Sequence, residues 1–345
     1  MKKFKRHRDF GFFDADIRIE KLISLGDPLH KLSKGINFEI FRPTLELSLS
    51  KLAKGAGGRP PYDYLMMFKV LILQRYFNLS DDQVEFQVCD RISFMRFLGL
   101  TISDDIPDSK TVWNFKEQLV GLGIVEVLFL LFTNELDQLG LILNQGKIVD
   151  ASFVEVPKQR NRKDENKTIK EGQIPQEFID NPNRLAQKDT DARWTKKNNT
   201  SYFGYKNHVK VDEKSKIIIT YKVTDASVHD SQEIVDLIDE KDKNQPLFAD
   251  SAYTGEDLHE KLIAKKVVLR IHEKGYKKNP LNEEQKATNK AKSSFRVRVE
   301  HVFGFMENSM NGMSLESRNF NRIAASIGMM NLVYNMFRKI QLQAI

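Results

Sequence analysis

The order of the elements expected after Gly146 constrains the fold of this chain more than any other feature. Three apolar stretches typical of strands come first, and short strands then alternate with helices. The expected strands span 147–154, 202–211, 217–223, 246–250 and 267–272, and the expected helices span 231–240, 255–265, 291–310 and 322–340. Consecutive strands favour antiparallel pairing, whereas strand–helix alternation favours parallel additions. The pattern therefore predicts an α/β fold in which helices cover a mixed sheet.

The part of the chain before Gly146 has a helical pattern instead. Helices are expected at 64–77, 80–98, 108–119 and 125–139. We therefore expect an all-α domain over residues 1–143, followed by the α/β domain over 144–345. The second domain would carry a polar, basic loop insertion at about 157–199.

The chain is basic, and its basic residues are unevenly distributed. It has 54 Lys and Arg against 47 Asp and Glu, which gives a formal net charge of +7. Six basic residues accompany two acidic ones in 158–170, ten accompany four in 184–222, and eight accompany two in 274–298. Each run alone is typical of a solvated loop, but three runs around one set of acids favour a polyanionic partner such as nucleic acid.

Cysteine usage and apolar stretches indicate the cellular setting. Cys89 is the single cysteine, and no Cys/His cluster has zinc-ligand spacing. The basic start is followed by acids where a signal peptide would be apolar, and the apolar patch at 127–132 is too short to span a bilayer. We therefore expect a soluble intracellular protein with no membrane partner.

Two carboxylates lie within or directly after short apolar strands. Asp150 follows Ile148 and Val149, and Asp250 follows Phe248 and Ala249. A bare carboxylate in a sheet core needs a partner that offsets its desolvation, and a metal ion is one such partner. Taken singly, each aspartate is more readily explained as the cap of the next turn.

A third carboxylate, Glu300, lies on a predicted helix. Val299, Val302 and Met306 belong to its apolar stripe, which repeats at three- and four-residue steps. Arg296 lies four residues before Glu300 on a neighbouring face, so a surface ion pair is the simpler explanation for this acid alone.

The three acids together indicate more than each one alone. In a ribonuclease H-like topology, the first and fourth strands lie side by side and the last core helix packs across them. Asp150, Asp250 and Glu300 occupy these three elements, so they could converge. Two divalent ions held there could activate water and relieve charge on a leaving oxygen in phosphodiester cleavage. Oxygen ligands favour Mg²⁺ or Mn²⁺ over zinc.

Four ordered blocks of the chain carry a more specific signal. They are 150–152 with 157–161, then 202–208, 249–255 and 296–304. These blocks resemble the DDE transposases of bacterial insertion sequences, especially the insertion-sequence-five group, over nearly the whole chain. The resemblance implies a ribonuclease H-like catalytic domain over 144–345, in which Asp150 bridges two Mg²⁺ ions and Asp250 and Glu300 complete their coordination. It also implies a bacterial cytoplasmic, nucleoid-associated protein.

The reaction implied by the resemblance is DNA transposition. Water attacks at a transposon end, and the freed 3′-hydroxyl then attacks target DNA. The concerted cutting of two ends implies a homodimer in the active complex. A non-catalytic DNA-binding derivative of such an element and a metal-dependent nuclease without joining activity are the alternatives.

Residues expected to contact DNA lie in both domains. In the second domain they are Arg296, Arg298, Lys158, Arg160, Lys206 and His208, and in the first they are Ser109, Lys110, Thr111 and Asn114. The latter four lie near the start of a possible recognition helix, although a helix that simply packs inward explains the same pattern. Lys206 and His208 could line a groove or belong to a solvated edge strand.

Two positions depart from the family pattern. Ser293 stands where the family has a tyrosine three residues before the helix arginine, and Glu307 stands where it has a lysine. In the family the tyrosine, arginine and lysine contact phosphates near the cut, so Arg296 could still do so, whereas Glu307 would repel a phosphate.

Overall fold

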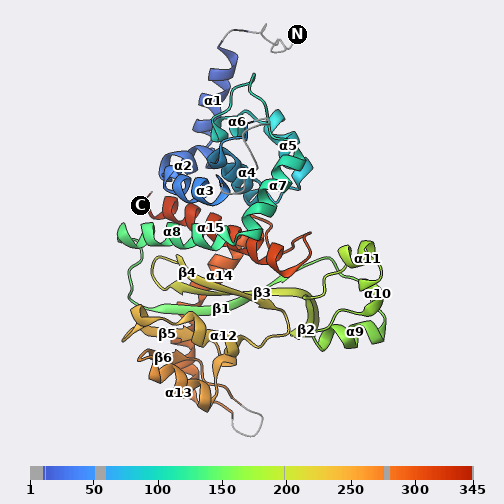
Figure 1. Ribbon diagram of the computed structural model, residues 1–345. Coiled ribbons are helices and arrows are strands. Elements are labelled where there is room, and N and C mark those ends of the chain that lie inside the picture. Colours follow the sequence, from blue (N-terminus) through green and yellow to red (C-terminus); the bar gives the residue numbers. More distant parts are fainter. Residues whose placement is uncertain (1–10, 12, 51–59, 198, 276–279, 344–345) are drawn as a thin grey trace, which may run out of the picture.

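A six-stranded mixed sheet forms the centre of the lower part of the molecule (Figure 1). The computed structural model describes residues 11, 13–50, 60–197, 199–275 and 280–343. The strands are β1 (Lys147–Glu155), β2 (Arg193–Lys197), β3 (Thr200–Asp212), β4 (Ile218–Asp225), β5 (Pro246–Ala249) and β6 (Val268–Ile271). β3 pairs antiparallel with β1, β2 and β4, whereas β5 pairs parallel with β1 and β6. The central order β4–β3–β1–β5–β6 is the ribonuclease H-like order, which confirms the predicted fold class.

The two faces of the sheet bury different cores. Ile148 of β1 and its neighbour Phe248 of β5 belong to the large core, together with Val299 of α14 (Glu283–Asn308). Val149 and Leu247, one residue away on each strand, belong to a smaller core beneath α12 (Asp230–Leu237) and α13 (Glu256–Ala264). Because successive side chains of a strand point to opposite faces, the residues at positions 150 and 250 are directed toward α14.

Helices make up the N-terminal part of the chain, as predicted. They are α1 (Asp14–Ser24), α2 (Pro28–Gly35), η1 (Phe38–Phe41), α3 (Arg42–Leu49), α4 (Tyr64–Tyr76), α5 (Asp81–Asp90), α6 (Ile92–Leu98), α7 (Ser109–Gly121) and α8 (Ile124–Gln138). A capping box of Ser80 and Gln83 begins α5, and Gly99 at φ +80° ends α6. The single helix expected over 80–98 is wrong, because Arg91 has an extended backbone and divides it into α5 and α6.

Helices of the C-terminal part cover the sheet and also join the two parts of the molecule. They are α12 (Asp230–Leu237), η3 (Glu240–Asp242), η4 (Ser251–Tyr253), α13 (Glu256–Ala264), α14 (Glu283–Asn308) and α15 (Phe320–Gln343). A capping box of Asn282 and Gln285 begins α14 earlier than expected. α15 packs against α2, α4 and α8, and lies between the N-terminal helices and the sheet (Figure 1). The boundary at 143 stays a prediction, since one core spans both parts.

The insertion at 157–199 is more ordered than a loop, so that prediction is wrong for its described residues. It contains α9 (Lys163–Lys170), α10 (Gln176–Ile179), α11 (Pro182–Ala186) and β2. Ile169 and Phe178 are buried, and the Arg184 guanidinium lies 4.8 Å from the Phe178 ring centroid. The insertion therefore has a small core of its own, which its polar composition concealed.

No single helix among the described residues is long and apolar enough to cross a membrane. The α7–α8 pair reaches that length and composition only when both helices, bent by 77°, are taken together.

Candidate active site

Asp150 is a carboxylate in the middle of a central strand. Its Oδ1 accepts a hydrogen bond from the Ala151 amide at 2.9 Å, and its Oδ2 accepts one from Nη2 of Arg296 at 3.2 Å. Only 15% of the Asp150 side chain is exposed. Burial raises the pKa of Asp150, and the positive charge of Arg296 only partly opposes this effect. The charged form of Asp150 is therefore less stable here than in water, even beside Arg296.

Asp250 lies directly after the neighbouring strand β5. Its Oδ1 accepts a hydrogen bond from the Ala252 amide at 2.7 Å, so it caps the short helix η4. Its backbone is still extended, which continues the alternation of β5 and directs the side chain toward α14. The charge of Asp250 also raises the pKa of Asp150, so the two carboxylates are close enough to interact. Asp250 therefore both caps η4 and lies near Asp150.

Glu300 occupies a different position from the two aspartates. It lies one helical turn beyond Arg296 on α14, is exposed, and has no hydrogen bond or ion pair within the described part of the chain. The ion pair expected between Arg296 and Glu300 does not form, because Arg296 is directed to Asp150. Within the same residues, no three His, Cys, Asp or Glu side chains are close enough together to hold a metal ion. The structure thus brings Asp150 and Asp250 together but leaves Glu300 apart.

The donor set of this pair fits a hard divalent cation. Asp150 and Asp250 offer carboxylate oxygens, which Mg²⁺ and Mn²⁺ prefer, and Mg²⁺ is often bound by only one or two carboxylates with water and substrate phosphate. Arg296 already forms an ion pair with Asp150. The Nε atom of Arg296 is buried without a hydrogen-bond partner in the described residues. A cation at Asp150 would therefore have to displace Arg296 or share the carboxylate with it.

His272 is a neighbour of the site that the sequence did not single out. It follows β6 as Asp250 follows β5, and its Nε2 lies 3.2 Å from Oγ of Ser293 and 3.0 Å from the carbonyl oxygen of Asn289. Burial lowers the pKa of His272, with Arg296 and Lys292 adding to this effect and the charge of Asp250 opposing it. The signal available in the sequence was position alone, since the ends of parallel strands meet at one edge of a sheet.

Ser293 and Glu307 lie on the same helix as Arg296 and Glu300. Besides its contact with His272, the Ser293 hydroxyl donates to the Asn289 carbonyl at 2.9 Å. Glu307 is exposed near the end of α14. Ser293 therefore fixes the helix against the end of β6, while Glu307 is free of packing constraints.

Lys206 and His208 are not surface residues, and their interpretation as DNA contacts is wrong. They lie on β3, which is paired on both sides by β1 and β4 and covered by α12. Nζ of Lys206 donates to Asp230 at 2.8 Å, and Nε2 of His208 lies 2.9 Å from Oγ1 of Thr224. His208 is fully buried, and burial lowers its pKa to about 4. Lys206 thus anchors the start of α12 to the sheet, whereas His208 joins β3 to β4.

The other basic residues predicted to contact DNA in this part of the chain differ in how exposed they are and in whether they form ion pairs. Arg298 is directed away from Asp150 and forms an ion pair with Glu213. Lys158 is exposed and lies 3.8 Å from Glu155 across a weak ion pair. Arg160 is exposed as well. Lys158 and Arg160 are accessible to a large ligand, whereas Arg298 would have to leave a buried carboxylate.

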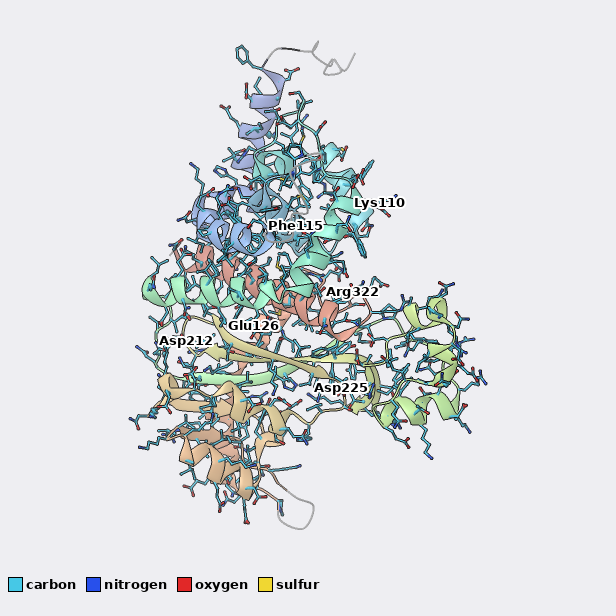
Figure 2. The ribbon with its side chains drawn as sticks, in the orientation of Figure 1. Lys110, Phe115, Glu126, Asp212, Asp225 and Arg322 are labelled. Atoms are coloured by element: carbon cyan, nitrogen blue, oxygen red, sulfur yellow. The ribbon has the colours of Figure 1, made fainter. Side chains whose placement is uncertain are left out.

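The predicted recognition helix is α7, and its N-terminal turns present the expected side chains. Lys110 and Asn114 are exposed, and Ser109 and Thr111 are half-buried. Lys110 projects from the outer side of the helical part (Figure 2). The opposite face packs inward through Val112, Phe115 and Leu119. The packing role and the exposed polar face thus coexist, while DNA contact by α7 stays a prediction.

Two family models match this chain. A model described as Transposase DDE domain matches residues 143–336, and one described as Transposase domain (DUF772) matches residues 17–118. Among solved structures, the piggyBac transposase synaptic complex with hairpin DNA is similar at 12% identity and a TM-score of 0.43, covering 90% of this chain and 72% of that chain. The pre-cleavage Mos1 transpososome is similar at 10% identity and a TM-score of 0.20, covering 85% and 82%. Both likenesses are weak, so the assignment depends on the family models.

The first model covers more than half of the chain, from the loop before β1 into α15. It therefore contains the sheet, both aspartates and α14. Enzymes of this kind generally use divalent metal ions. The chain belongs to the DDE transposase family, whose enzymes cut and rejoin DNA in transposition.

Proposed function

We propose that Asp150 and Asp250 hold Mg²⁺, or Mn²⁺ in its place, and that Glu300 completes the coordination of a second ion. The observation that carries this proposal is the placement of Asp150 on β1 and of Asp250 directly after the parallel neighbour β5, with both side chains directed to α14 and close enough for Asp250 to raise the pKa of Asp150. Two like charges so close together are costly without a shared cation.

Such cations, when bound, strengthen water as a nucleophile at neutral pH and stabilise the leaving oxygen of a phosphodiester. The chain's own residues prepare the site for this chemistry. Burial of Asp150 keeps bulk water away, and its hydrogen bond to the Ala151 amide fixes Oδ1, while Oδ2 is paired with Arg296. Arg296 forms an ion pair with Asp150 and could exchange that carboxylate for a phosphate oxygen of DNA, because both present oxygens to the same guanidinium.

The substrates proposed for this site are the inverted-repeat ends of the element and a target DNA. Water cuts at an end and leaves a 3′-hydroxyl, which then attacks a target phosphodiester, so one bond forms as another breaks in each step. Exposed residues of α7, chiefly Lys110 and Asn114, would bind the ends. Two copies of the chain would act together, one at each end.

The metal site can be tested by direct binding without DNA. We expect Asp150→Asn and Asp250→Asn each to weaken Mn²⁺ binding, measured by electron paramagnetic resonance, by about tenfold or more, since each removes a charged ligand. Asp257→Asn is a matched control, because Asp257 is exposed at the start of α13 and should leave the affinity unchanged. Equal Mn²⁺ affinity in all four proteins would refute the proposed site.

A further inference from the structure

A cavity of about 440 Å³ lies between the N-terminal helices and the segment that leads into α15, and neither Asp150 nor Asp250 lines it. One wall comes from α4, α5 and α7, and the other from residues 315–329. Apolar side chains, among them Leu79, Leu119 and Val120, line it together with several charged ones. Because apolar walls lower the local dielectric, a charge at the wall of this cavity interacts more strongly than one on an open surface.

Arg75 is the buried charge of this cavity. It lies at the end of α4, is 9% exposed, and donates from Nη2 to Oδ1 of Asn78. Its Nε is buried without a partner, and in the described part of the chain no carboxylate pairs with it. Burial lowers the pKa of Arg75 to about 10, which leaves the guanidinium charged at neutral pH. A buried cation that lacks an anion is costly, so its retention calls for a ligand.

The other cations of the cavity are better compensated than Arg75. Nζ of Lys116 donates to Asp81 at 2.7 Å, and Nη2 of Arg322 donates to Glu117 at 2.8 Å. The first pair lies within one wall and the second joins the two walls, and neither cation needs a further anion. Figure 2 shows Arg322 at the start of α15, below the end of α7.

Arg318 adds a second uncompensated charge. It is half-buried in the opposite wall and has no ion-pair partner among the described residues. The cavity therefore presents guanidinium groups from two walls, with Glu316 as an exposed acid beside them. Guanidinium groups bind phosphate through parallel hydrogen bonds, and Nε of Arg75 is a donor without a partner among the described residues.

The mouth of the cavity lies beside the exposed face of α7. Trp113 lines the cavity and is 44% exposed, and it directly precedes Asn114 in the sequence. A phosphate that entered here would contact the N-terminal helices and the segment after α14 at once. The site would thus connect the helical part to the helix that carries Arg296 and Glu300.

We propose that this cavity is a phosphate-binding site, with Arg75 as its principal anion-binding residue and Arg318 as the second. The phosphate belongs either to the backbone of bound DNA or to a free nucleotide, since both present the same oxygens to a guanidinium. The proposal does not depend on the metal site, so either can fail without the other.

The test compares wild type, Arg75→Met, Arg318→Met and the control Lys261→Met. If the ligand is a free phosphate compound, we expect inorganic phosphate or dAMP to bind wild type in calorimetric titrations at matched ionic strength. If the ligand is DNA, we expect a short duplex to bind wild type with a slope of log K against log salt that includes the phosphate contact of this cavity. Arg75→Met should weaken phosphate binding about tenfold or more, or lower the slope of log K against log salt for the duplex by about one. The first result identifies a free phosphate compound as the ligand, and the second identifies DNA.

Thermal unfolding separates binding from folding. Arg75→Met removes an unpaired buried charge, so its unfolding midpoint should equal or exceed that of wild type. Lys261→Met is the control, because Lys261 is exposed on α13 and does not line the cavity, so this variant should bind phosphate and DNA as wild type does. Arg318→Met tests the same site at a half-buried position, where the substitution should disturb folding less than at Arg75. Unchanged affinity for phosphate, dAMP and duplex in both arginine variants would overturn the proposal.

Discussion

At the scale of single residues, burial decides which charged side chains are available to DNA or metal. Asp150 is buried beside one arginine and close to a second carboxylate, so a cation would relieve its charge. Lys206 and Lys210 are buried too, but each has aspartate partners, so their charges are already balanced. The sequence left open whether Lys206 lines a groove or belongs to a solvated edge strand, and the pairing of β3 on both edges shows that its strand is internal.

His208 provides a prediction on pH dependence. Its pKa is lowered from 6.5 to about 4 in the folded protein, so the unfolded chain binds more protons between these values. The free energy of unfolding should therefore decrease as the pH falls from 6.5 toward 4, by up to about 3 kcal/mol from this residue. Denaturant unfolding at several pH values should show a shallower pH dependence in His208→Gln. His301→Gln, at an exposed position, should retain the wild-type slope.

At the scale of elements, α14 is the helix on which the site depends. Its buried stripe of Val299, Val302 and Met306 fixes it across β1 and β5, which turns Arg296 toward Asp150. Glu300 lies on the adjacent exposed face, so its joining of the site needs a side-chain rotation or a small movement of the helix. DNA binding to Arg296 would favour such a movement, because it would break the ion pair between Arg296 and Asp150.

Glu300 and Glu307 make a matched pair of tests on this helix. Both are exposed, so neither Glu300→Gln nor Glu307→Gln should change the unfolding midpoint measurably. DNA cleavage with Mg²⁺ should fall about a hundredfold or more in Glu300→Gln, the scale of losing one electrostatic stabiliser, and stay near wild type in Glu307→Gln. Full activity in Glu300→Gln would remove this residue from the catalytic set.

The sequence predicted most elements and missed those determined by long-range packing. The succession of strands and helices followed from hydrophobic runs. Asp150 lies on the strand expected for it, whereas β5 ends one residue before Asp250. The break at Arg91 and the small helices of 157–199 could not be predicted, because they depend on tertiary contacts such as Arg184 with Phe178. The early start of α14 had a local signal in Asn282 and Gln285. The distance of Glu300 from Asp150 depends on helix rotation, which periodicity does not specify.

The exposed face of α7 gives a second prediction at this scale. If Lys110 contacts a phosphate, Lys110→Ala should weaken DNA binding by a similar factor for all sequences and reduce the slope of log K against log salt by about one. Lys261→Ala on α13 is the control, since Lys261 is exposed on a distant helix. Fluorescence anisotropy at several salt concentrations measures both slopes. Identical slopes for Lys110→Ala and wild type would exclude this contact.

At the scale of the whole molecule, α15 joins the helical part to the catalytic sheet. It packs against α4 and α8 on one side and contacts β4 on the other, so a movement of the helical part reaches the sheet through a continuous core. The net charge of +7 draws the chain toward DNA, but burial removes several basic residues from contact. Among the basic residues predicted to contact DNA, Lys110, Lys158 and Arg160 are the exposed ones in the described part of the chain.

The central claim, that Asp150 is a ligand of the catalytic metal, is tested most directly by cleavage and strand transfer on DNA that carries the element's inverted-repeat ends. With Mg²⁺, wild type and Asp257→Asn should cut the ends and join them to target DNA, with no products when a chelator is present. Asp150→Asn should bind the same DNA with unchanged affinity and produce neither cut nor joined DNA. Cleavage by Asp150→Asn at the wild-type rate would contradict the account.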